Sequence, residues 1–105
     1  MTAGTGTDAN PRDGDRVTFA IDVELNIVAV SRTDPQGCEA LARASRALAK
    51  IASGKRIDEI WKIDVQTLAA AMDDLAEDDE RCALTAIGAL RAAVVDARVR
   101  GLIAG

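Results

Sequence analysis

The stretch Arg16-Val17-Thr18-Phe19-Ala20-Ile21-Asp22-Val23 decides the fold class, because four large apolar residues occupy every second position along it. A period of two predicts a half-buried β-strand with one apolar face. A β-branched run over residues 27–33 follows after a turn at 24–26, so the two runs should pair as an antiparallel hairpin. A hairpin alone is marginal in water, and its apolar face therefore needs helices to cover it.

Three helical segments after the hairpin can supply that cover. Their expected bounds are 38–53, 65–75 and about 80–100, with a short helix or turn over 55–61 that places Trp61 in the core. Gly54 is expected to end the first of them, Asp64 to cap the second, and the third is apolar almost all round. This order of elements predicts an α+β fold with a small antiparallel β-sheet covered by helices.

The first residues differ in composition from the rest. Residues 1–14 are predicted to be a flexible N-terminal arm, because small polar residues with Gly and Pro bury too little surface, and residues 15–105 are predicted to form one domain. No signal peptide or membrane-spanning run is visible, so we expect a cytoplasmic protein. In that compartment two cysteines indicate free thiols or a metal site rather than a disulfide.

Composition argues against several functions. The chain has no histidine, no tyrosine, one Phe, one Trp and a net charge of −4. So few aromatic residues offer little surface for base stacking, and an acidic chain is poorly suited to bind phosphate backbones or anionic membranes. Neither a nucleic acid nor a membrane is therefore expected as a partner. Without histidine or a glycine-rich phosphate loop, no conventional hydrolase or transferase centre is visible, and an enzyme is not expected.

Cys38 and Cys82 each stand where a long alanine-rich helix is expected to begin. The free N–H groups and the dipole at that end of a helix favour a thiolate, so a lowered thiol pKa is expected at both positions. A thiolate binds metals and attacks electrophiles. Two interpretations remain open, a thiolate site and two small buried core residues.

Four motifs in sequence order resemble those of a known family. They are Pro11-Arg12-Asp13-Gly14-Asp15, Gln36-Gly37-Cys38, Gly54-Lys55-Arg56-Ile57-Asp58-Glu59 and Arg81-Cys82-Ala83-Leu84. They resemble the P-x-C-G-D, G-C, G-K-S-L-D-E and K-C-A-T-L motifs of the U-type iron–sulfur cluster scaffolds: IscU, SufU and the N-terminal domain of NifU. The chain differs in carrying Asp13 where the family has its first cysteine, and it lacks the L-P-P-V-K segment.

This resemblance implies a SufE/NifU-like fold and an iron–sulfur cluster assembly scaffold. Such a protein accepts sulfur from a cysteine desulfurase, holds iron or a labile 2Fe-2S cluster, and passes it to a recipient apo-metalloprotein. Here the ligands would be Cys38, Cys82 and Asp13 or Asp15, with Cys82 as the sulfur acceptor. Asp15 corresponds to the family aspartate that favours cluster lability.

Other interpretations stand beside the scaffold. Two thiolates with the carboxylates of Asp13 and Asp15 suit a tetrahedral Zn²⁺ or a labile iron equally well, which allows a zinc-dependent sulfur-acceptor protein. The chain could also be a degenerate, non-catalytic interaction protein that binds a desulfurase or a metalloenzyme. The last helix is apolar on nearly all sides, which also allows a contact in a homodimer.

Overall fold

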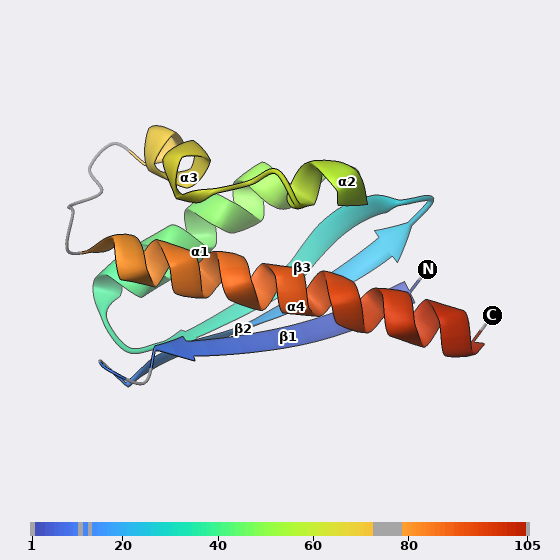
Figure 1. The fold of residues 1–105 in the computed structure, drawn as a ribbon, viewed down its shortest axis with the longest axis horizontal. Coiled ribbons are helices and arrows are strands. Elements are labelled where there is room, and N and C mark those ends of the chain that lie inside the picture. Colours follow the sequence, from blue (N-terminus) through green and yellow to red (C-terminus); the bar gives the residue numbers. More distant parts are fainter. Residues whose placement is uncertain (1, 11, 13, 73–78, 105) are drawn as a thin grey trace.

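Three antiparallel strands form a single sheet in the order β1-β2-β3 (Figure 1). The computed structural model describes residues 2–10, 12, 14–72 and 79–104. The strands are β1 (Thr2–Asn10), β2 (Asp15–Glu24) and β3 (Ile27–Gln36). The predicted hairpin is confirmed as β2 and β3. Leu25 and Asn26 between them have φ values of 53° and 65°, which is the backbone signature of the two-residue turn that fits strand twist.

Strand β1 shows that the prediction of a flexible arm is wrong over Thr2–Asn10. The strand pairs with β2 from Thr2 opposite Val23 to Asn10 opposite Asp15. Its buried positions are Gly4 and Gly6, so the apolar alternation that identifies a strand in a sequence is missing. Backbone pairing and the close approach of a helix stabilise β1 in place of large buried side chains.

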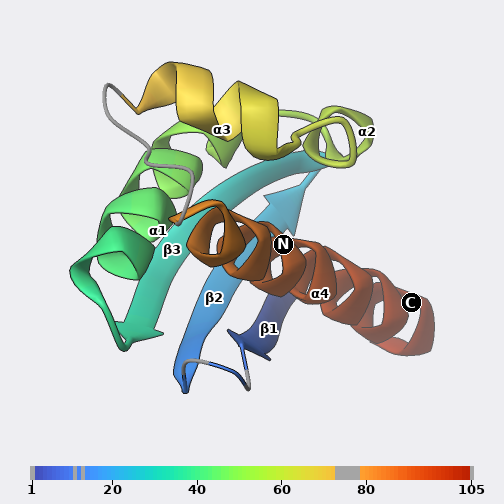
Figure 2. The ribbon, with the colours of Figure 1, turned by 60° about the vertical axis from the view of Figure 1, so that its left-hand side comes forward.

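The helices are α1 (Glu39–Ala52), α2 (Ile57–Ile60), α3 (Val65–Ala71) and α4 (Glu80–Ala104). Figure 2 shows α1 and α4 side by side over one face of the sheet, and α3 contacts both. This arrangement confirms the α+β class with an antiparallel sheet covered by helices. No helix in the described part of the chain combines the length and hydropathy needed to cross a lipid bilayer.

The core lies between this sheet face and the two long helices. Its largest fully buried side chains are Val17, Phe19, Ile21, Val28, Leu41, Leu48, Ile60, Leu68, Leu90 and Val94. Helix α4 adds a row of small buried residues, Ala86, Ala89, Ala93 and Ala97. These alanines let the helix backbone approach the glycines of β1.

Three boundaries or placements differ from expectation. Helix α3 ends at Ala71 because Met72 takes an extended conformation, and α4 continues through Gly101 instead of ending at Arg100. Trp61 is 37% exposed and not in the core, because Ile60 and Ile63 occupy the inward positions of that turn. Its ring lies 5.9 Å from the guanidinium carbon of Arg91, a cation–π arrangement.

Candidate metal centre

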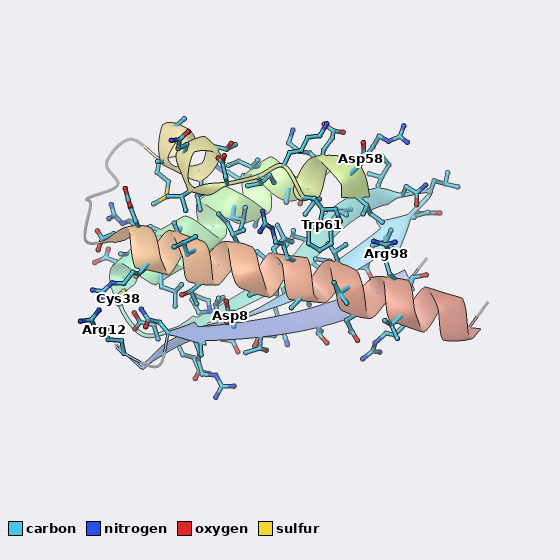
Figure 3. All side chains as sticks on the ribbon, viewed as in Figure 1. Asp8, Arg12, Cys38, Asp58, Trp61 and Arg98 are labelled. Carbon is cyan, nitrogen blue, oxygen red and sulfur yellow. The ribbon has the colours of Figure 1, made fainter. Side chains whose placement is uncertain are left out.

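Asp15, Cys38 and Cys82 come from three separate elements that meet at one end of the molecule. Asp15 is the first residue of β2, Cys38 immediately precedes α1, and Cys82 lies in the first turn of α4. Figure 3 shows Cys38 at the same end as Arg12, which belongs to the turn between β1 and β2. One ligand atom from each of the three residues lies within 4.8 Å of the others.

The distances between these atoms fit a shared metal ligand set. The two Sγ atoms are 3.3 Å apart, and Asp15 Oδ2 lies 3.4 Å from Cys38 Sγ and 3.8 Å from Cys82 Sγ. Ligands of a tetrahedral zinc ion are separated by about 3.5 to 3.8 Å, given the usual metal–sulfur and metal–oxygen bond lengths. The three atoms are therefore close to one face of a coordination tetrahedron, although the two sulfurs are nearer to each other than a bound zinc ion would hold them.

Backbone geometry holds the Asp15 carboxylate in place. Asp15 is 6% exposed, and its Oδ1 accepts a hydrogen bond of 3.1 Å from the Cys38 N–H. Gly37 has a φ of +140°, and a Cβ there would collide with this carboxylate. A glycine is thus required before Cys38 for both backbone conformation and space. Sequence reasoning named Asp15 as a ligand but had no signal for its bond to the helix start.

A family model described as the NifU-like N terminal domain matches residues 1–102. The chain belongs to the NifU-like N-terminal domain family. The resemblance seen in the four sequence motifs is therefore confirmed.

Two relatives of this NifU-like chain come from Archaeoglobus fulgidus and are named iron-sulfur cluster assembly scaffold proteins IscU 1 and IscU 2. Each is 36% identical to it over 93 residues, which is 89% of this chain. The chain spans 61% of the length of each relative.

Of the four predicted ligands, the fold of the NifU-like chain brings three together. Asp13 lies outside the described residues. Cys38 is exposed, so the interpretation of both cysteines as buried core residues is wrong for Cys38. Cys82 is 5% exposed and belongs to the core cluster, yet its sulfur also faces the other two ligand atoms.

The environment of Cys82 opposes the thiolate in the absence of a metal. Burial, the contact with the Cys38 sulfur, and the nearby charges of Asp15 and Asp79 raise the pKa of Cys82 to about 12. The expectation of a lowered pKa is therefore wrong here, because desolvation outweighs the helix dipole. A bound cation would reverse this balance, since it stabilises the thiolate directly.

Alkylation should separate the two thiols in the metal-free NifU-like chain. At pH 8 we expect iodoacetamide to modify Cys82 more slowly than Cys38 by roughly 100-fold or more, because burial and a raised pKa leave almost no accessible thiolate. Peptide mass spectrometry after timed quenching gives both rates, and the denatured chain serves as the control in which the rates converge. Equal rates in the folded chain would contradict the buried placement of Cys82.

Proposed function

We propose that this NifU-like domain is an iron–sulfur cluster assembly scaffold, acting as a carrier and not as an enzyme. The observation that carries the proposal is the convergence of the Asp15, Cys38 and Cys82 ligand atoms within 4.8 Å. Family membership and 36% identity to two relatives named as scaffolds support it. Iron, or a 2Fe-2S cluster, is then the cargo of the site.

The donor set favours a weakly held cargo. Thiolates are the usual ligands of iron–sulfur clusters, and a carboxylate is a harder, more readily exchanged donor for iron. Asp13, in the motif position of a family cysteine, is proposed as the fourth ligand. With Cys38 exposed at the molecular surface, cargo bound here would be accessible to a recipient apo-metalloprotein.

Sulfur delivery by a cysteine desulfurase is proposed to involve both thiols. Cys82 remains the predicted final acceptor, although Cys38 is the exposed one. A persulfide on Cys38 would place its outer sulfur near Cys82, because the two Sγ atoms are 3.3 Å apart. With a cation bound at the centre Cys82 would be a thiolate and would attack that outer sulfur, and Cys38 would leave as a thiolate, so the transfer needs no oxidant.

Cluster assembly can be tested on anaerobically purified protein. Incubated with ferrous iron, cysteine, a desulfurase and dithiothreitol, which reduces the persulfide sulfur to sulfide, the native chain should acquire iron and acid-labile sulfide in equal amounts and pass both to an apo-ferredoxin. The double variant Cys38→Ser/Cys82→Ser should acquire neither. Asp58→Asn is the matched control, because Asp58 is exposed and lies far from Cys38 in Figure 3.

Two other results would replace the proposal. Stoichiometric zinc without sulfide, lost in the double cysteine variant, would favour the zinc-dependent sulfur acceptor, which the same donor set suits. If the protein takes up no metal under any of these conditions, the remaining interpretation is a non-catalytic interaction protein. Mass spectrometry of the desulfurase reaction would show whether the persulfide ends on Cys82.

A further inference from the structure

A groove of about 480 Å³ lies between α1 and α3, and its lining residues differ from those of the metal centre. Four apolar residues line it, Ala47, Ile51, Ala71 and Met72. Three cationic residues line it as well, Arg43, Arg46 and Lys50. This α1–α3 groove combines an apolar surface with positive charge and has no acidic residue among its described lining residues.

The three cations have no anionic partner in the described part of the chain. The ion pairs found there join Arg56 to Asp58 and Arg100 to Asp96. Glu39 stands four residues before Arg43 on α1, yet no ion pair forms between them. A locally positive groove on a chain with a net charge of −4 attracts anionic groups.

The spacing of the cations suits a helical or extended peptide. Arg43, Arg46 and Lys50 stand at positions i, i+3 and i+7 of α1 and so share one stripe of the helix, about 10 Å long. Beside the stripe, Ile51 and Met72 are only partly buried against the core. Methionine is flexible and polarisable, so such a surface adapts to an incoming apolar side chain.

We propose that the α1–α3 groove is a docking site for an acidic amphipathic segment of a partner protein. Apolar side chains of the segment would contact Ile51 and Met72, and its carboxylates would pair with Arg43, Arg46 and Lys50. Cys38 precedes Arg43 by just over one helical turn, so the docked partner would lie next to the metal centre. The inference does not depend on which cargo that centre carries.

The chemistry favours a protein segment over other anionic partners. A nucleic-acid duplex or a lipid surface needs an extended basic face, whereas this chain offers three cations around one apolar groove and is acidic overall. Carboxylate groups spaced along a helix match the guanidinium groups individually and can accept two hydrogen bonds from each. The apolar lining adds burial that phosphate groups cannot use.

The test uses the full metal-free chain and a synthetic amphipathic peptide with leucines on one face, flanked by glutamates. A peptide of equal length with lysines replacing the glutamates is the control ligand. Binding is followed by fluorescence anisotropy and by amide shifts in NMR spectra. We expect the acidic peptide to bind more tightly than the lysine peptide, to shift residues 43–51 and 71–72, and to lose affinity with added salt.

Charge reversal should localise the site. We expect a lower affinity for the acidic peptide in two variants, Arg43→Glu/Arg46→Glu and the exposed single change Lys50→Glu. The double variant should lose about tenfold or more. Arg32→Glu is the matched control, because Arg32 is exposed on β3 outside the groove, and it should leave affinity unchanged. Circular dichroism would show that each variant is folded.

Several outcomes would overturn the proposal. These are equal affinity for the two peptides, no binding of the acidic peptide, and shifts confined to residues outside the groove. Tighter binding to an RNA duplex, or to vesicles of phosphatidylglycerol and phosphatidylcholine, with the same sensitivity to Arg43→Glu/Arg46→Glu would assign the groove to a nucleic acid or a membrane instead.

Discussion

Cys82→Ser is expected to weaken the affinity of the metal-free chain for Co²⁺ by about 100-fold or more, since even changes to residues that only support metal ligands cost 10- to 100-fold. The serine hydroxyl is a poor ligand at neutral pH, and only Asp15 and Cys38 of the three clustered ligands would remain. The charge-transfer absorption between thiolate and Co²⁺ should fall to the intensity of one thiolate. Titration followed by absorption spectroscopy measures both effects.

Two further variants show whether the effect belongs to the ligand. Asp15→Asn should weaken Co²⁺ binding less, because both thiolates stay and the amide oxygen can still donate. Thr85→Ser on the next turn of α4 keeps the hydroxyl that bonds to the Arg81 carbonyl and should bind Co²⁺ as the native chain does. Full Co²⁺ affinity in Cys82→Ser would remove Cys82 from the centre.

Gly6→Ala is expected to lower the free energy of unfolding by more than about 3 kcal/mol, beyond the usual cost of inserting a methyl group into a packed core. The new Cβ would lie 2.6 Å from the Ala92 carbonyl carbon, and relieving this clash requires α4 to move away from β1, which opens the packing between them. Urea titration followed by circular dichroism gives the free energy and its dependence on urea.

Gly101→Ala is the control for this change. Gly101 lies in α4, and among the described residues a Cβ there would meet the Thr2 side chain at 3.8 Å, an ordinary contact distance. Alanine favours a helix by about 1 kcal/mol over glycine, so this variant should be as stable as the native chain or more stable. If Gly6→Ala matched it in stability, β1 would not pack on α4 as described.

Periodicity was enough to predict the elements whose side chains build the core. The alternation of Val17, Phe19 and Ile21 identified β2, and the glycine after α1 marked where that helix ends, with Gly54 at a φ of +90°. The same reasoning missed β1, because its inward positions are glycines. A strand that packs through backbone contact leaves no hydrophobic pattern to detect.

The sequence was enough to predict which residues form the candidate centre, but not the burial and hydrogen bonds around them. Motif order pointed to Asp15, Cys38 and Cys82, which the fold does bring together. The predicted direction of the Cys82 pKa shift was wrong, because the prediction considered the helix start and not the desolvation that burial of the sulfur causes. The hydrogen bond from the Cys38 N–H to Asp15 likewise depends on chain geometry that no spacing encodes.

The pairing of β1 with α4 also bears on how the chain matures during translation. The Thr5 N–H donates to the Asp96 carboxylate, 91 positions further along, so β1 leaves the ribosome long before α4, the helix that packs on it. Contacts between such distant segments form slowly. A nascent β1 made mainly of Thr, Gly, Ala and Asp has little hydrophobic surface with which to aggregate while it waits. The glycines that remove the hydrophobic pattern from this strand therefore also lower the tendency of the unfinished chain to aggregate.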